Sequence, residues 1–255
     1  CRFIPSVPGY LYGVRDNDIY VNLFASSTST INVAGKKVVL EETTEYPWDG
    51  DIKIKVLKSA ARDVNLMVRI PGWVRNHVLP SSLYEYSDTL RPSYKVTVNG
   101  KMITGNLDVN KGYLPVRGIR KGDVVRVHFD MPVRTVVANK NVKDDNGRVA
   151  VERGPMVYCA EAVDNQGKPV LHVVMPKISS FDIVDDYRID NTEADGARPF
   201  AVKAITTQAQ VLEDTSNGVS AKSHKLTLIP YYAWNHRGAG QMNVWFIQSL
   251  KMLDR

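Results

Sequence analysis

The sequence has little cysteine and no long apolar run. Its 255 residues include two cysteines, Cys1 and Cys159. Two cysteines supply neither a disulfide framework nor a zinc-ligand spacing. Cys159 lies within the apolar run from Met156 to Ala160 and is expected to be a small core residue. No apolar run approaches the ~18 residues of a membrane-spanning helix, so we expect no membrane partner.

The motifs of common enzyme classes are also missing. The sequence contains no Gly-x-Ser-x-Gly, no phosphate-binding loop and no Gly-x-Gly-x-x-Gly. Its five histidines stand in no metal-ligand spacing, and His128 is expected at the surface. Glu152 and Glu161 flank a Gly-Pro break and are not expected to converge as the paired carboxylates of a glycosidase. A surface or ion-pair role is expected for them, with an arginine as the partner considered for Glu152, and no catalytic residue is assigned.

Two binding classes are disfavoured by the distribution of charge. Residues 1–134 carry 19 Lys and Arg against 13 Asp and Glu, yet the basic residues alternate along predicted strands, as Lys53 and Lys55 do. This is typical of a solvated sheet face, so no nucleic-acid partner is expected. The acidic loop at 182–195 lacks the Asp-x-Asp-x-Asn-Gly order of a calcium loop. A polar, solvated loop is expected there.

Strand patterns dominate what is present. Residues 51–56 and 125–129 alternate apolar and polar side chains, and residues 18–24, 64–70 and 94–98 are rich in β-branched and aromatic residues. The dipeptides at 99–100 and 146–147 are both Asn-Gly, which favours type I′ hairpins. Such signals recur roughly every 8–15 residues, as they do in sandwiches and jelly rolls. The sequence predicts an all-β chain.

The predicted organisation has three parts. The first part is residues 1–17, of which residues 1–14 could be helical only as a fragment, because Pro5 and Pro8 allow little regular helix. Two β-sandwich or jelly-roll-like domains follow, at 18–133 and 134–255. The final strand near 242–248 is placed in the second domain, with a return to the first left open.

Four tryptophans are candidate platforms for sugar stacking, namely Trp48, Trp73, Trp234 and Trp245. Trp73 is the best candidate, because Pro71-Gly72 places it at a strand end. The competing interpretation is core packing, which accounts for most tryptophans in sandwiches.

An ordered set of segments resembles one known family. The segments are Arg69-Ile70-Pro71-Gly72-Trp73, Val98-Asn99-Gly100, Gly112-Tyr113-Leu114, Lys121-Gly122-Asp123, Met131-Pro132-Val133, residues 148–161, residues 229–238 and Met242-Asn243-Val244-Trp245. Together they are similar to the C-terminal half of the β-L-arabinofuranosidases of glycoside hydrolase family 127. No single segment is decisive, but the order is specific and spans essentially the whole chain.

The resemblance implies a catalytic part that this chain lacks. In the family, an N-terminal (α/α)6 barrel carries the active site and precedes the sandwiches. A zinc ion is held there by three cysteines and a glutamate, with one thiolate as the proposed nucleophile and another glutamate as acid/base. Residues 1–17 would be a remnant of that helical barrel. Cys1 would lie a few residues beyond the zinc ligands, or would be the second cysteine of an adjacent pair. One thiol cannot hold zinc alone, so no cofactor is expected in this chain.

The expected function is therefore structural. The chain would be a non-catalytic β-region that braces the missing barrel, with Tyr231-Tyr232-Ala233-Trp234 suited to packing between domains. One alternative is a carbohydrate-binding module for arabinose-containing glycans that uses exposed aromatics such as Trp73. Another is an adhesive scaffold. The absence of an initiator methionine or signal peptide leaves localisation open, with bacterial periplasm and cytoplasm both compatible with the parent.

Overall fold

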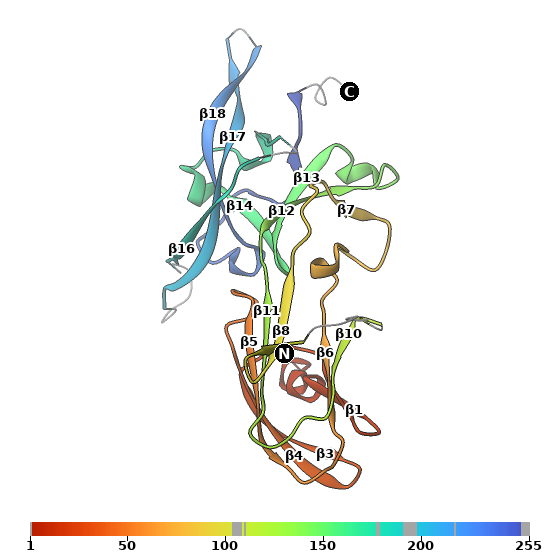
Figure 1. Cartoon of the computed structure of the whole chain (residues 1–255). Helices are drawn as coiled ribbons and strands as arrows, with labels where there is room; N and C mark the ends of the chain where they lie inside the picture. Colours follow the sequence, from red (N-terminus) through yellow and green to blue (C-terminus); the bar gives the residue numbers. More distant parts are fainter. Residues whose placement is uncertain are drawn as a thin grey trace. The chain divides into compact units, whose positions relative to one another are not determined.

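The computed structural model describes residues 2–103, 109, 111–176, 179–190, 198–216 and 218–250. The chain divides into two compact units. Unit 1 comprises Cys1–Asn76 and Arg91–Met131, and unit 2 comprises His77–Leu90 and Pro132–Arg255. Both are built from strands joined by short turns (Figure 1). The prediction of an all-β fold is confirmed, and Cys1 lies outside the described residues.

Unit 1 contains two sheets. A four-stranded sheet has the order β1-β2-β6-β10, and a six-stranded sheet has the order β3-β4-β5-β11-β8-β9. Their elements are η1 (Ile4–Tyr10), β1 (Tyr12–Arg15), β2 (Asp18–Val21), β3 (Ser27–Val33), β4 (Lys36–Thr44), β5 (Asp51–Ser59), β6 (Asn65–Arg69), η2 (Trp73–Arg75), β8 (Tyr94–Val98), β9 (Lys101–Met102), β10 (Tyr113–Val116) and β11 (Val124–Phe129).

The period-2 pattern of these strands puts one face of each sheet in the core. In β5 and β11, Ile54 lies opposite Val125 and Ile52 opposite Val127, and all four are at most 2% exposed. The alternate residues, such as Lys53 and Lys55, remain on the other face. The four-stranded sheet buries the apolar residues of β2, β6 and β10 in the same way. The strands predicted from alternation are thus confirmed.

The two Asn-Gly signals have different outcomes. Asn99 and Gly100 have φ of 51° and 80° and close the β8–β9 hairpin, as a type I′ turn requires. Asn146 instead has φ −63° and ψ 128°, with φ of 75° at Gly147. These angles are those of a type II turn, so the second I′ prediction is wrong. The turn ends a longer connection rather than a tight hairpin.

Unit 2 is centred on a ten-stranded sheet of order β19-β14-β18-β17-β15-β20-β13-β12-β7, with β16 paired to β17. Two buried clusters line it, one around Tyr158 and Leu228 and another around Cys159 and Ile229. Its elements are β7 (Tyr84–Tyr86), β12 (Val133–Ala138), η3 (Lys143–Asp145), β13 (Arg148–Arg153), β14 (Met156–Glu161), η4 (Ala162–Asn165), η5 (Val170–His172), β15 (Val173–Val174), β16 (Asp182–Ile189), β17 (Phe200–Thr215), β18 (Gly218–Pro230), η6 (Tyr231–Ala233), β19 (Met242–Asn243) and β20 (Phe246–Ile247).

The chain crosses between the units more often than the sequence indicates. Residues 77–90, which the sequence analysis places in the first domain, belong to unit 2, where β7 pairs β12. The strands at 242–243 and 246–247 pair β14 and β13 of unit 2 and do not return to the first sandwich. Near the N-terminus, β1 pairs β2, so residues 12–15 of the expected barrel remnant lie in a sheet of unit 1.

Within the part of the chain that the structure describes, the helical segments are short 3-10 turns. The first of these, η1, buries none of its residues. Among the described residues no helix is long and apolar enough to cross a membrane.

Candidate functional site

Trp73, the predicted sugar platform, lies in the interior of unit 1. Its side chain is in η2 and is only 7% exposed. The indole Nε1 donates a hydrogen bond to the Tyr46 hydroxyl (3.3 Å), and the ring packs edge-on against Phe129 at 5.8 Å. Pro71-Gly72 does place Trp73 at a strand end, but the turn folds it inward. The expectation of an open stacking face at Trp73 is therefore corrected, because the ring is enclosed.

The other residues singled out from the sequence are dispersed. His128 is partly exposed, and its Nδ1 and Nε2 lie 2.7 and 3.4 Å from carboxylate oxygens of Asp51 and Asp130. Cys159 is fully buried, as expected, and burial, followed by the nearby charges of Glu161 and Asp164, raises the pKa of its thiol to about 12. A thiol of this kind is neither a nucleophile nor a ready metal ligand near neutral pH.

The described residues do not fit a zinc site. No group of three or more His, Cys, Asp or Glu in the described ranges is arranged to hold a metal ion. Zinc in proteins is normally four-coordinate, with Cys, His or carboxylate ligands.

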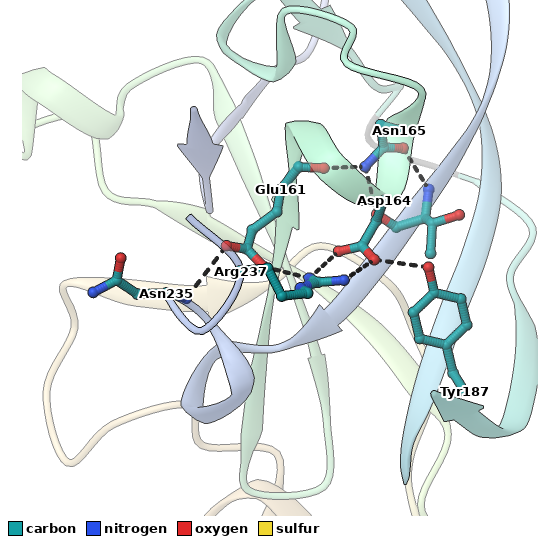
Figure 2. Close-up of polar contacts among 7 residues, drawn as sticks. Glu161, Asp164, Asn165, Tyr187, Asn235 and Arg237 are labelled. Atoms are coloured by element: carbon teal, nitrogen blue, oxygen red, sulfur yellow. Dashed lines mark hydrogen bonds and ion pairs between the residues drawn. The ribbon is translucent and has the colours of Figure 1, made fainter. Parts of the chain in front are cut away.

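A buried charged cluster in unit 2 brings together residues far apart in the sequence (Figure 2). We call Glu161, Asp164 and Arg237, with the partners Tyr187 and Asn235, the Arg237 cluster. The Arg237 guanidinium donates two hydrogen bonds of 2.6 Å to Asp164 and a further one to Glu161. Tyr187 donates to Asp164 (2.7 Å), and the backbone N–H of Asn235 donates to Glu161 (3.2 Å).

Four elements position this cluster. Glu161 ends β14, Asp164 lies in η4, Tyr187 lies in β16, and Arg237 lies in the segment after η6. The side chains of Arg237, Glu161 and Asp164 are 9%, 8% and 1% exposed. A bidentate pair in such surroundings is geometrically specific, because the planar guanidinium matches the two carboxylate oxygens.

Electrostatics favour a fixed structural role for the cluster. Burial alone would lower the pKa of Arg237, but the hydrogen bonds and charges of Asp164 and Glu161 outweigh it and raise the pKa. Burial, reinforced by Asp164, raises the pKa of Tyr187 to about 12. Both carboxylates are occupied by internal donors. Of the surface and ion-pair roles predicted for Glu161, the structure shows the ion pair, at a buried position.

Asn165 links the Arg237 cluster to the strand β18. Its amide nitrogen donates to the carbonyls of Glu161 (2.8 Å) and Thr227 (3.0 Å), and its amide oxygen accepts from the Thr227 N–H (2.9 Å). The end of β14, η4 and β18 are thereby joined through one side chain.

Beside this framework the chain presents exposed aromatic side chains. Tyr231 and Tyr232 in η6 are 46% and 50% exposed, and the ring of Tyr231 stacks on Trp234 with centroids 5.7 Å apart. The pair Tyr158–Pro230 joins β14 to the last residue of β18. Val157, which is 36% exposed, precedes Tyr158 in β14, and Tyr231 follows Pro230 as the first residue of η6. We call Val157, Tyr231, Tyr232 and Trp234 the aromatic face.

A second buried charge cluster fixes residues 77–90 to unit 2. Arg134, 3% exposed, donates to the Asp88 carboxylate from Nη2 (2.8 Å) and Nε (3.1 Å). Its guanidinium carbon lies 3.5 Å from the ring centroid of Tyr86, whose hydroxyl donates to Glu152 (3.1 Å). Glu152 lies opposite Arg134 in the β12–β13 register, but its hydrogen-bond donor is the Tyr86 hydroxyl and the ion pair of Arg134 is with Asp88. The ion pair of Glu152 with an arginine therefore stays a prediction.

The buried Glu42 and the half-buried Glu152 have strongly raised pKa values. Burial raises the pKa of Glu152 to about 7, although the Tyr86 hydroxyl and the Arg134 charge lower it in part. In unit 1, burial raises the pKa of Glu42 to about 7 against hydrogen bonds from Tyr12 and the Ala25 N–H. Each is held inside a sandwich rather than in an open site.

The Arg237 cluster could not be predicted from the sequence. Asp164 and Tyr187 stand in segments without a motif, and Arg237 lies within residues 229–238, one of the segments that carry the family resemblance. The sole sequence signal is a run of acids after an apolar strand with a distant arginine. Nothing in such a pattern specifies that they meet.

Comparison with protein families identifies two matching domains. Residues 18–131 match the description "Beta-L-arabinofuranosidase, GH127 middle domain". Residues 133–247 match "Glycoside hydrolase family 127 C-terminal domain".

Individual relatives agree with this result. The chain is 32% identical over 254 residues to the non-reducing end β-L-arabinofuranosidase of Bifidobacterium longum subsp. longum, covering 95% of this chain and 35% of that protein. A solved GH127 β-arabinofuranosidase, BT3674, is 45% identical with a TM-score of 0.88. The Ara127N β-L-arabinofuranosidase of Geobacillus stearothermophilus T6 is 28% identical with a TM-score of 0.77. These two matches cover 98% and 96% of this chain but only 38% and 36% of theirs.

Proposed function

Because the chain belongs to glycoside hydrolase family 127 and carries its middle and C-terminal domains, we propose that it is the non-catalytic β-region of a β-L-arabinofuranosidase-like enzyme. In this proposal it braces a catalytic (α/α)6 barrel of the same protein, which also supplies the zinc. The chain spans about 35% of the curated relative's length, and this difference leaves room for a catalytic part. The parent would release L-arabinose from arabinose-containing glycans.

The aromatic face is the observation that carries the bracing role. Tyrosine and tryptophan combine a large apolar area with a polar tip, which suits them to interfaces between domains. Here the Tyr231 ring is supported by Trp234, and the segment that follows is anchored through Arg237 to two buried carboxylates. A surface held this rigidly loses little conformational entropy when a partner covers it.

The bracing role can be tested by comparing this chain with a longer protein that also contains the region encoded upstream. Replacement of Tyr231 and Tyr232 by Ser should lower the melting temperature and arabinosidase activity of the longer protein. The 255-residue chain alone should change little, because both side chains are about half exposed. Differential scanning calorimetry and release of L-arabinose from a β-L-arabinofuranoside are the measurements.

The matched control is Val219→Ser, which removes another exposed apolar side chain, 65% exposed, from β18 of the same unit. It should leave both proteins unchanged. Zinc-dependent release of L-arabinose by the 255-residue chain alone would contradict the non-catalytic assignment. Equal effects of the tyrosine replacements on the short and the long protein would contradict bracing.

The alternative of a carbohydrate-binding module based on Trp73 receives no support from the burial of that ring. The exposed aromatics of η6 are assigned to bracing instead. Binding of neutral arabino-oligosaccharides to the 255-residue chain that is lost in the Tyr231 and Tyr232 variants would favour the binding module over bracing.

A further inference from the structure

Unit 1 carries a polar groove that the proposed bracing role does not use. It has a volume of about 610 Å³, within the range of small-molecule sites. The groove lies along strands of the six-stranded sheet, where its cations Lys53, Lys95 and Arg126 alternate with buried residues and so come from the face opposite the core. It is lined by Ser26, Thr43, Thr44, Glu45, Asp49, Asp51, Ile52, Lys53, Lys95, Thr97, Arg126, Val127 and His128.

Two cations stand directly opposite each other in the middle of this groove. Lys53 of β5 is the antiparallel partner of Arg126 in β11. Directly opposed side chains lie about 5 Å apart at Cβ, and like charges in such positions destabilise a sheet. Thr43 and Thr97 are the next partners outward on the two sides, so one row across four strands consists of a hydroxyl, two cations and a hydroxyl.

The nearby acids do not neutralise this pair. No ion pair within the described residues involves Lys53, Lys95 or Arg126. Asp51 instead lies within 2.7 Å of the His128 ring, and Asp49 accepts the Asp51 backbone N–H. Asp51 and Asp49 are thus engaged by other groups, whereas Lys53 and Arg126 line the groove, and within the described residues neither forms an ion pair with the remaining lining acid, Glu45.

We propose that this groove binds an acidic saccharide, with the carboxylate of a hexuronate residue held between Lys53 and Arg126. Arginine binds a carboxylate through two parallel hydrogen bonds, and lysine adds a point charge. The flanking hydroxyls of Thr43 and Thr97 and the carboxylates of Asp49 and Asp51 suit the hydroxyl groups of a sugar. These acids also disfavour a dianion such as a phosphate, so a group with a single negative charge fits the lining better.

The absence of an aromatic platform in the groove disfavours neutral sugars as ligands. The groove lining contains no Phe, Tyr or Trp. A neutral sugar would therefore gain no stacking contact and would depend on hydrogen bonds that compete with water. The negative charge supplies the specificity.

The experiment measures binding of trigalacturonic acid by isothermal titration calorimetry, with its methyl ester as the matched neutral ligand. The 255-residue chain should bind the acid and not the ester, and the affinity should fall as ionic strength rises from ~0.02 to ~0.5 M. Arg126→Gln should weaken binding by about tenfold or more. The melting temperature of the Arg126→Gln variant should be no lower than that of the native chain, because the repulsion between Lys53 and Arg126 is removed.

Lys36→Gln is the control, since it removes one exposed positive charge from β4 outside the groove. It should leave the affinity unchanged. Equal binding of acid and ester, equal loss in Lys36→Gln and Arg126→Gln, or tighter binding of a sulfated disaccharide would overturn the proposal. So would an absence of binding at millimolar ligand in low salt. Each of these outcomes is independent of arabinosidase activity and therefore separate from the bracing proposal.

Discussion

At the scale of single residues, the interior of this protein contains two kinds of buried carboxylate. Glu161 and Asp164 are paired with a buried guanidinium, which compensates for their loss of hydration. Glu42 receives hydrogen bonds but has no buried cation bonded to it, and burial dominates its pKa. Glu152 lies near Arg134, yet the effect of burial still prevails. The same side-chain chemistry thus has different protonation behaviour in different surroundings.

Stability is expected to fall with rising pH through the titration of Glu42 and Glu152. Burial raises both pKa values from 4.5 to about 7, so the folded chain holds protons that the unfolded chain releases. This contribution is complete below pH 4.5 and is lost as the pH rises through about 7. The double variant Glu42→Gln/Glu152→Gln should flatten the pH dependence of the unfolding free energy, by on the order of 3 kcal/mol for each glutamate between the two ends. Urea unfolding at a series of pH values measures it.

Glu213→Gln is the control with the opposite sign. Hydrogen bonds from Lys168 and Lys222 lower the pKa of Glu213 to about 2, so its contribution is present above pH 4.5 and is lost as the pH falls through about 2. This variant should leave the slope between pH 4.5 and 7 in place. A slope there that survives the double glutamine variant would contradict the prediction.

At the scale of elements, side-chain clusters attach segments that have few backbone pairs of their own. The segment after η6 is joined to η4 through Arg237, and residues 77–90 are joined to β12 through Asp88 and Arg134. The strand β7 contributes only three residues to the sheet. A strand this short needs additional contacts, because each ladder pair contributes about 0.2–1 kcal/mol.

Replacement of Arg237 by Met should destabilise unit 2 by about 3–5 kcal/mol, because it leaves two buried carboxylates without their cation. The loss should be largest at low salt and neutral pH. Amide hydrogen exchange should also become faster at Asn235, whose N–H donates to Glu161. Urea unfolding and exchange detected by NMR are the measurements.

Arg188→Gln is the control variant for Arg237→Met. Arg188 pairs with Asp190 through side chains that are 70% and 66% exposed. Exposed pairs contribute about 0–1 kcal/mol, so this variant should be nearly neutral. Equal losses in Arg237→Met and Arg188→Gln would show that the cluster does not anchor the segment.

At the scale of the whole molecule, the chain forms two units with separate cores. Each unit is assembled from two segments that are separated in the sequence, because residues 77–90 interrupt unit 1 and belong to unit 2. Both are large enough for an independent hydrophobic core. The division into middle and C-terminal family domains at 131 and 133 falls at the same place as the return of the chain to unit 2.

Matched core replacements should separate the two units in unfolding experiments. Leu40 in unit 1 and Leu228 in unit 2 are both 0% exposed, so each Leu→Ala change should cost about 2–5 kcal/mol. We expect two transitions in calorimetry, with Leu40→Ala lowering one and Leu228→Ala lowering the other. A single transition lowered equally by both variants would contradict independent units.

Much of this architecture could be predicted from the sequence because it depends on local patterns. Alternation in residues 51–56 and 125–129 assigned a buried and a solvated face before any pairing was known, and the pleat of a strand enforces that assignment. The apolar surroundings of Cys159 predicted its burial for the same reason. The family followed from the order of several short segments, none of which required knowledge of contacts.

What the tertiary structure alone decided are the encounters between distant residues. The direction of the turn at Gly72 encloses Trp73, and no local signal distinguishes an inward from an outward turn. The meeting of Asp164 with Arg237, and of Lys53 with Arg126, depends on strand register and on the path of the connections. Sequence periodicity fixes which face a side chain takes, whereas long-range pairing fixes its neighbours, and the proposed functions of this chain depend on those neighbours.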